Sequence, residues 1–185
     1  MDALAALTSR VSPAALDSPG PSADALEAIL QAAVAAADHG RMKPWRFILI
    51  DGAARDNFGV LLADALRRRE PAAPAGKLEA ERKKALRAPL IVVVAAAVQP
   101  AAKVPEVEQV VAVGAAAQNM LVAAHALGFG GFWRTGAIAY DAAMKRALGL
   151  AETDAIVGFL YLGTTKTPGQ PRQSDIASVT RRWAG

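Results

Sequence analysis

The sequence predicts an α+β protein in which a mixed central sheet of about four or five strands is flanked by helices. The chain has 185 residues, which is enough for one domain with a substantial core. Hydrophobic residues make up 53% of the chain and charged residues 21%, a globular composition. Helical patterns of unequal length alternate irregularly with short apolar runs. We therefore expect a single domain over residues 1–185, in which residues 165–185 form a polar C-terminal tail.

The first half of the chain carries several helical patterns and one strand. Apolar residues recur at helical spacing after Ser22, a predicted N-cap, until Gly40 ends the pattern. The apolar run "WRFILID" after Pro44 predicts a strand. Two basic helices follow, and the stretch "EPAAPAG" between them predicts an exposed link. The predicted helices span residues 1–9, 22–40, 56–69 and 77–87.

The second half contains the most apolar segments. The run "PLIVVVAAAV" at residues 89–98 predicts a buried strand. A long helix is predicted over residues 105–127. Gln118, Asn119 and His125 interrupt its uncharged part, which favours a core helix over a membrane span. The other predicted elements are a turn and strand in "GFGGFWRTG" at 128–136, a short helix at 140–148 and a last core strand at 155–162.

The net charge of +4 suits a small anionic ligand better than a nucleic acid or an acidic membrane. Basic residues concentrate at residues 67–69 and 77–87, where Glu79 and Glu81 interrupt them. No aromatic side chain is interleaved there for stacking on bases. These segments therefore predict solvated helix faces, and we expect neither a nucleic-acid partner nor membrane association.

Several reaction chemistries lack the residues that they require. The chain contains no cysteine, which excludes disulfides and thiolate chemistry. His39 and His125 have no spacing that assembles three metal ligands, and no serine lies in a glycine-flanked elbow. We therefore predict no metal site and favour a bound organic cofactor. The first residues lack the pattern of a secretory leader, so the expected location is the cytoplasm.

Four separated stretches carry a family resemblance. They are the start "MDALAALTSRVS", "ADHGRMKPWRF" at residues 37–47, "GFGGFWRTG" at 128–136 and "IVGFLYLGT" at 156–164. In order and spacing they resemble the nitroreductase family of FMN-dependent oxidoreductases, in its minimal bacterial NAD(P)H nitroreductase branch. The resemblance covers the chain to about Thr164 and fades in the tail.

The resemblance implies a nitroreductase-like fold and a homodimer that binds FMN at its interface, with the long apolar helix in the contact between subunits. An alanine-rich helix too apolar to face water agrees with a two-fold interface. The resemblance also implies that Arg10 and Ser12 grip FMN, because a phosphate dianion requires a guanidinium fork and a hydroxyl donor. Val11 lies between them, where close relatives often have a second arginine.

His39 and the "KPWRF" that follows resemble the segment that runs beside the flavin ring. Lys43 replaces the usual glutamine of that segment, and Ala37 stands where a proline is common. Arg10 and Lys43 are the candidates for a positive charge near flavin N1. Without the resemblance, a polar loop residue is the favoured explanation of His39.

Trp133, Arg134 and Thr135 resemble the family's Trp-Arg-Ser/Thr triplet at the flavin. Gly130 and Gly131 are then expected to let the backbone approach the cofactor. On the residues alone, the tryptophan is explained as a core aromatic and the glycines as a bulge or tight turn.

The implied activity is a ping-pong transfer of two electrons from NAD(P)H, through FMN, to an electron-poor acceptor such as a nitroaromatic or a quinone. No side chain has to act as an acid or base in hydride transfer, so no catalytic residue is predicted. Two alternatives stay open because a fold does not prove a function. One is a flavin storage, sensor or flavin-destroying protein without reductase turnover, and the other is a cofactor-free interaction protein.

Overall fold

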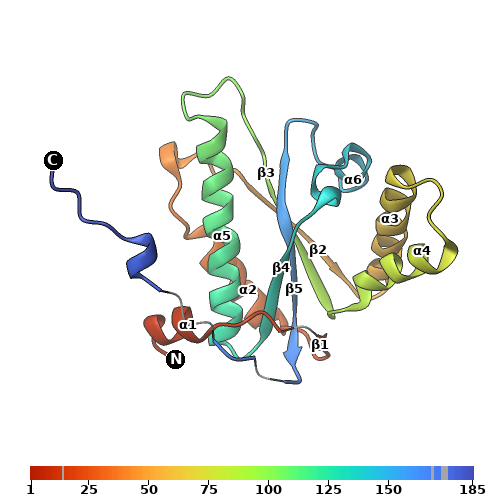
Figure 1. Ribbon diagram of the computed structural model, residues 1–185, viewed down its shortest axis with the longest axis horizontal. Helices are drawn as coiled ribbons and strands as arrows, with labels where there is room; N and C mark the ends of the chain where they lie inside the picture. Colours follow the sequence, from red (N-terminus) through yellow and green to blue (C-terminus); the bar gives the residue numbers. More distant parts are fainter. Residues whose placement is uncertain (14, 168, 172–174) are drawn as a thin grey trace.

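The computed structural model describes residues 1–13, 15–167, 169–171 and 175–185, and its centre is a five-stranded sheet between two layers of helices (Figure 1). β3 (Leu90–Ala96) lies between β2 (Trp45–Asp51) and β5 (Ala155–Thr165). β4 (Gly130–Arg134) and the short β1 (Leu16–Asp17) also pair with β5. This architecture confirms the predicted α+β class.

All strand pairings among the described residues are antiparallel, so the expectation of mixed strand directions is wrong. The reason lies in the connection between β2 and β3, which contains two helices, α3 (Ala54–Arg69) and α4 (Ala75–Arg82). The helix pair returns the chain to the same end of the sheet at which β2 finishes. Asp51 at the end of β2 therefore pairs with Leu90 at the start of β3. A single crossover helix is the usual connection of a parallel pair instead.

The two faces of the sheet bury separate hydrophobic cores. α2 (Ala23–Val34) and α5 (Glu106–Ala126) cover one face, and α3 and α6 (Ala142–Ala147) lie on the other (Figure 1). β3 is buried along its whole length because alternate side chains enter the two cores. Burial of each valine or isoleucine there contributes about 1.5–3 kcal/mol relative to exposure.

Most helix boundaries follow the predictions, but α2 ends earlier than expected. Ser22 is its N-cap and accepts a hydrogen bond from the Ala25 N–H at 3.3 Å. The helix stops at Val34 rather than Gly40, and beyond it the Asp38 carboxylate accepts the Lys43 N–H at 2.7 Å and closes a turn. The remaining elements are α1 (Ala3–Ser9) and the 3₁₀ turns η1 (His39–Arg41), η2 (Lys83–Leu86), η3 (Ala137–Tyr140) and η4 (Ala177–Val179).

α5 is the central helix of the domain. By length and composition alone it could cross a membrane, but its inner face is buried against the sheet and α2. The Asn119 side chain donates to the Ala32 carbonyl at 3.0 Å and ties α5 to α2. On its outer face, Val107 and Val111 are 66% and 64% exposed and Ala115 is exposed one turn further on. An apolar stripe is therefore left uncovered near the start of the helix.

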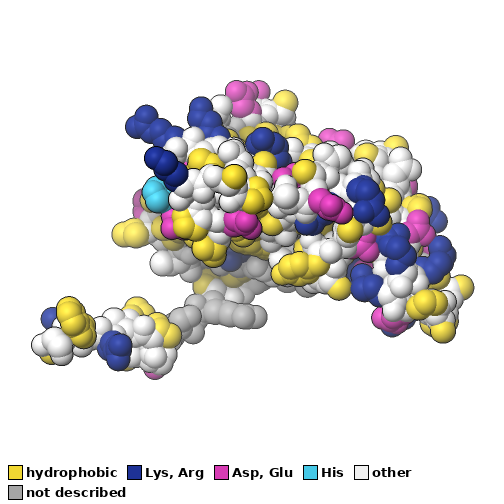
Figure 2. Space-filling model, turned by 90° about the horizontal axis from the view of Figure 1, so that it is seen from above, with side chains coloured by type: hydrophobic (Ala, Val, Ile, Leu, Met, Phe, Trp, Pro, Cys, Tyr) yellow, Lys and Arg dark blue, Asp and Glu magenta, His cyan; other side chains and the backbone are white. Residues whose placement is uncertain are grey.

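The basic helices α3 and α4 form a solvated surface, as their composition predicts. Five ion pairs join residues on or between these helices and η2. Figure 2 shows acidic and basic side chains interspersed over this face. These pairs offset part of the local positive charge, and exposed pairs of this kind contribute about 0–1 kcal/mol each.

Gly163 in β5 tests the packing of the sheet. A Cβ at this position would lie 2.6 Å from Pro89 Cδ and 2.8 Å from the Asp17 carbonyl oxygen. We expect Gly163→Ala to lower the free energy of unfolding by about 1–3 kcal/mol, because the obstructing atoms cannot move freely. Gly76 on α4 has open space around it, so Gly76→Ala should instead raise the free energy of unfolding by about 0.5 kcal/mol. Urea titration of both variants measures these changes. A Gly163→Ala variant with the same free energy of unfolding as the wild type would contradict the close packing around Gly163.

Candidate functional site

The segment from Arg10 to Ser12 is fixed to the C-terminal end of α5. The Ser9 hydroxyl donates to the Ala5 carbonyl at 2.6 Å and lies 2.8 Å from His125 Nε2. Because a hydroxyl has a single proton, the imidazole is the donor in the second bond. His125 is thus a positioning residue for the segment that follows Ser9.

Arg10, Val11 and Ser12 adjoin one another at a surface cavity of about 620 Å³. The Arg10 guanidinium donates to the Ser12 hydroxyl at 3.3 Å. This arrangement presents a positive charge beside a hydroxyl group, as a phosphate requires. Described residues of the tail line the same cavity: Gly169 packs against Val11, and Ile176 is part of the lining.

A second cleft, of about 690 Å³, brings Ser12 together with Arg134, which lies more than a hundred residues further along the chain. Pro13, Leu16, Leu86 and Phe132 give the cleft apolar walls, and Asp17 and Arg87 add charge. The volume falls within the range of about 300–1,000 Å³ that is typical of cofactor sites. Two of the sequence motifs therefore meet at one cleft.

Arg134 connects this cleft to a smaller cavity. Its guanidinium carbon lies 4.9 Å from the centre of the Phe132 ring, a cation–π contact. Phe132 in turn stacks on Tyr161 with ring centres 5.1 Å apart. The Arg134 Nε is buried and has no hydrogen-bond partner among the described residues. A buried donor left unpaired costs about 1–3 kcal/mol, so this atom is suited to a ligand oxygen.

The smaller cavity, of about 70 Å³, contains residues that sequence reasoning missed. Thr135 lines it together with Glu81, Lys84 and Tyr161. Lys84 is paired with Glu81 and is only 33% exposed. The basic pattern of residues 77–87 predicted a solvated helix face, and no local spacing signals that Lys84 turns inward toward β4 and β5.

Trp133 faces away from both cavities. Successive strand side chains point to opposite faces, so Phe132 and Arg134 face α3 while Trp133 packs toward α5. The Trp133 indole N–H donates to the Val157 carbonyl at 3.2 Å.

Gly130 and Gly131 are packed closely against other parts of the protein. A Cβ at Gly130 would overlap the side chains of Leu16 and Thr165, and one at Gly131 would lie 2.8 Å from Leu121 Cδ2. Close packing therefore accounts for both glycines, and the approach of a cofactor to their backbone stays a prediction.

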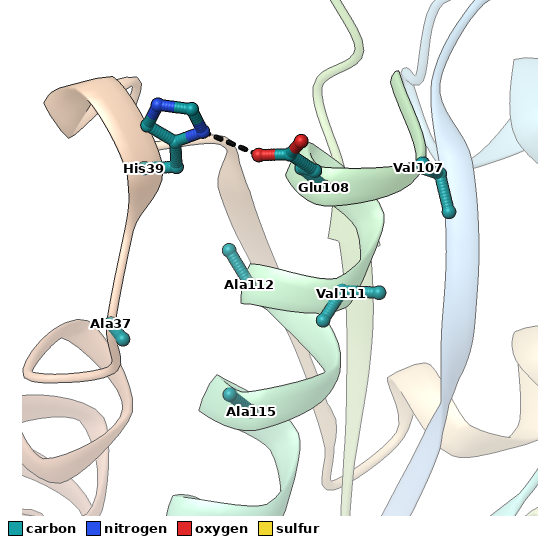
Figure 3. Close-up of a pocket in the computed structure, with 7 residues that line it drawn as sticks. All are labelled: Ala37, His39, Val107, Glu108, Val111, Ala112 and Ala115. Atoms are coloured by element: carbon teal, nitrogen blue, oxygen red, sulfur yellow. Dashed lines mark hydrogen bonds and ion pairs between the residues drawn. The ribbon is translucent and has the colours of Figure 1, made fainter. Parts of the chain in front are cut away.

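His39 lies in a separate and strained turn. Arg41 and Lys43 have φ angles of 53° and 49°, which non-glycine residues rarely adopt. His39 Nδ1 is hydrogen-bonded to Glu108 in the first turn of α5 (Figure 3). Strain of this kind persists only where the surroundings enforce it and is frequent at functional sites.

The His39 side chain stands at the mouth of an apolar groove of about 310 Å³ (Figure 3). The groove follows the outer face of α5, and its lining includes Ala37, Val107, Val111 and Ala115. It contains the exposed apolar stripe of this helix.

The predicted contacts therefore form two half-sites at opposite ends of α5. Ser9 is anchored at His125 and His39 at Glu108, which are separated by about 25 Å along the helix at 1.5 Å per residue. Arg10, Val11, Ser12, Arg134 and Thr135 line the cavities of the first half-site, and His39 lines the second. One chain does not bring the two half-sites together.

These features define an α+β protein with a basic, donor-rich ligand cleft and a separate histidine-bearing half-site. The chain belongs to the nitroreductase family, whose model matches residues 7–164. Family membership confirms the resemblance carried by the sequence motifs and the expectation of an oxidoreductase enzyme.

Relatives and solved structures agree with this assignment. The chain is 41% identical over 168 residues to a protein of Escherichia coli named "Putative NAD(P)H nitroreductase YdjA", covering 89% of this chain and 88% of the relative. A nitroreductase-like protein of Bacillus cereus has a similar fold, with a TM-score of 0.82, 23% identity and coverage of 100% and 97% of the two chains. A nitroreductase of Desulfovibrio desulfuricans solved in complex with FMN has a TM-score of 0.76, 24% identity and coverage of 100% and 98%.

Asp141 holds the segment that follows Thr135. It caps α6 by accepting the Met144 N–H at 2.8 Å and forms an ion pair with Arg68 of α3 at 3.0 Å. Partial burial of the carboxyl opposes ionisation, but the hydrogen bond from Met144 and the Arg68 guanidinium outweigh it and lower the pKa of Asp141. Because the folded-state pKa is depressed, the stabilisation is complete above the unfolded pKa and is lost as pH falls through the folded value.

We expect Asp141→Asn to lower the free energy of unfolding by about 1 kcal/mol at pH 7, and the difference from the wild type to shrink below about pH 4. Urea titrations at both pH values measure this. The control is Asp64→Asn, whose ion pair with Arg67 is exposed and should contribute little at either pH. A pH-independent difference for Asp141→Asn would contradict the role of its charge.

Proposed function

We propose that the protein is an FMN-dependent oxidoreductase of the cytoplasm that transfers two electrons from NAD(P)H to an electron-poor acceptor, a nitroaromatic or a quinone, by a ping-pong mechanism. The observation that carries this proposal is the cleft in which Ser12 and Arg134 meet beside an unpaired buried donor. The names of the relatives and the FMN-bound fold neighbour support the same cofactor and electron donor.

The residues present fit FMN at its phosphate end. Arg10 and Ser12 supply a guanidinium and a hydroxyl within hydrogen-bonding reach of each other. A phosphate that displaces their mutual contact would gain charge-assisted hydrogen bonds. The His125–Ser9 bond holds this pair against α5, so less ordering is needed when the ligand binds.

The residues also fit the ring end. Phe132 and Leu16 offer apolar surface to a flat ring, and the Arg134 Nε offers a donor to a carbonyl oxygen. Lys84 also lines the adjoining small cavity, where it is paired with Glu81, whereas Lys43 follows His39 in the other half-site. Bound FMN would supply the hydride chemistry, while these residues bind it, orient it and favour negative charge at its edge.

The separation of the half-sites supports a homodimer. Two copies related by a two-fold axis, with their α5 helices antiparallel, would bring His39 of the partner subunit to the basic half-site of the first. The same contact would cover the stripe of Val107, Val111 and Ala115, which is exposed in a single chain. In this arrangement each of two FMN sites uses residues of both subunits.

The visible spectrum of the purified protein tests the proposal. We expect flavin absorption that bleaches when NADH or NADPH is added anaerobically and returns with a nitroaromatic or a quinone. Arg10→Ala should weaken FMN binding by about ten- to a hundredfold, because it removes charge-assisted hydrogen bonds to the phosphate. Arg146→Ala on α6 removes an arginine outside the described cavities and should leave FMN affinity unchanged.

Bound flavin that stays oxidised with both donors would contradict the reductase and favour storage or sensing. A protein that cannot be reconstituted with FMN would contradict both the reductase and the storage or sensor protein. The cofactor-free interaction protein would then be the remaining alternative.

A further inference from the structure

Tyr161 is a buried tyrosine that none of the sequence motifs assigns to the site. It lies in the middle of β5 and is 3% exposed. One side of its ring stacks on Phe132, with an angle of 17° between the planes. Its side chain lines the small cavity of about 70 Å³. No hydrogen bond joins its hydroxyl to another residue in the described part of the chain.

The small cavity is rich in hydrogen-bond donors. Its polar lining comes from Arg134, Thr135, Lys84, Glu81 and Tyr161. The one carboxylate, Glu81, is paired with Lys84. The Arg134 Nε is buried without a partner among the described residues. Arg134 and Tyr161 thus lie on neighbouring strands and line one cavity, and the buried Arg134 Nε costs free energy while it stays unpaired.

The Tyr161 hydroxyl is a donor at every pH at which the protein works. Burial raises the pKa of Tyr161 to about 12, and the positive charges of Arg134 and Arg87 offset this only in part. The group is therefore a neutral O–H and not a base.

The size of the cavity limits what it can hold. A volume of about 70 Å³ admits about two water molecules or a single carbonyl group, but no aromatic ring. Arg134 lines this cavity and the cleft of about 690 Å³ beside it. A ring bound in the larger cleft would lie beside this arginine, and the smaller cavity has room for one of its oxygen atoms.

We propose that the Tyr161 hydroxyl and the Arg134 Nε–H together bind one carbonyl oxygen of the cofactor ring and raise the reduction potential of the bound flavin. This inference rests on the proposed FMN site. Ring carbonyl oxygens gain negative charge when the flavin is reduced, so donors that are fixed in a water-poor cavity bind the reduced form more tightly than the oxidised form. Tyr161 is then a binding residue that tunes the cofactor without exchanging a proton.

The test is Tyr161→Phe, which removes one oxygen atom and keeps the ring that stacks on Phe132. The matched control is Tyr140→Phe, because Tyr140 is the other tyrosine of the chain and is 82% exposed on η3. For the wild type and both variants, the reduction potential of bound FMN is measured against a reference dye at pH 7. FMN affinity and the melting temperature of the apoprotein are measured in parallel.

We expect Tyr161→Phe to lower the preference for reduced over oxidised FMN by about tenfold, which for a two-electron couple is a potential about 30 mV more negative. Tyr140→Phe should match the wild type. The Tyr161→Phe apoprotein should melt at or above the wild-type temperature, because the lost hydroxyl has no described partner to leave unpaired.

Three results would overturn this inference but leave the proposed function unaffected. The first is a Tyr161→Phe protein that binds FMN with an unchanged potential. The second is a lower melting temperature of its apoprotein without a change in potential, which would assign the hydroxyl a structural role. The third is a small free anion as the ligand: chloride or nitrate would then raise the melting temperature of the wild-type apoprotein but not of the variant, with the potential unchanged. Wild-type protein that binds no FMN would overturn the proposed function as well.

Discussion

The packing of α5 across the sheet fixes the positions of two segments that the proposed cofactor site uses, Arg10–Ser12 and the turn at His39. The helix is held on its inner face by the core and by the bond from Asn119 to α2. Its C-terminal end fixes the Arg10–Ser12 segment through His125, and its first turn holds His39 through Glu108. A rigid helix of 21 residues cannot bring its two ends together. One chain therefore keeps the two half-sites apart, and this separation, together with the uncovered apolar stripe, is what supports the proposed homodimer.

The basic half-site is organised by hydrogen-bond donors more than by net charge. The ion pairs at α3, α4 and η2 involve five of the 21 Lys and Arg residues of the chain, so part of its basic surface is already paired within the protein. The donors that matter are few and lie beside apolar walls, at Arg10, Arg134 and Tyr161. In such surroundings an unpaired donor is costly, and a ligand that offers an acceptor removes this cost. This pattern suits a ligand that offers an electron-rich oxygen.

The sequence predicted the elements whose signals are local. The strand "WRFILID" coincides with β2, and the alanine-rich pattern predicted α5 to within one or two residues. Strand direction was predicted wrongly, because it depends on how α3 and α4 return the chain. The motif residues Ser12 and Arg134 do share a cleft, whereas Lys84 and Tyr161 could not be found, because they join the site through tertiary contacts alone. The close packing of Gly130 could not be predicted from the local sequence either, because its neighbours Leu16 and Thr165 are distant in sequence.

A subunit complementation experiment tests the shared site most directly. One variant carries Arg10→Ala and Ser12→Ala, and the other carries His39→Ala, so that each homodimer is damaged in both of its sites. Differently tagged chains are mixed, and heterodimers are purified through both tags and titrated with FMN. If each site uses both subunits, one of the two sites in the heterodimer is free of substitutions, and we expect one tight FMN site per heterodimer with matching NAD(P)H-dependent turnover. A heterodimer in which neither tight binding nor turnover returns would contradict the account, because each site would then belong to a single chain.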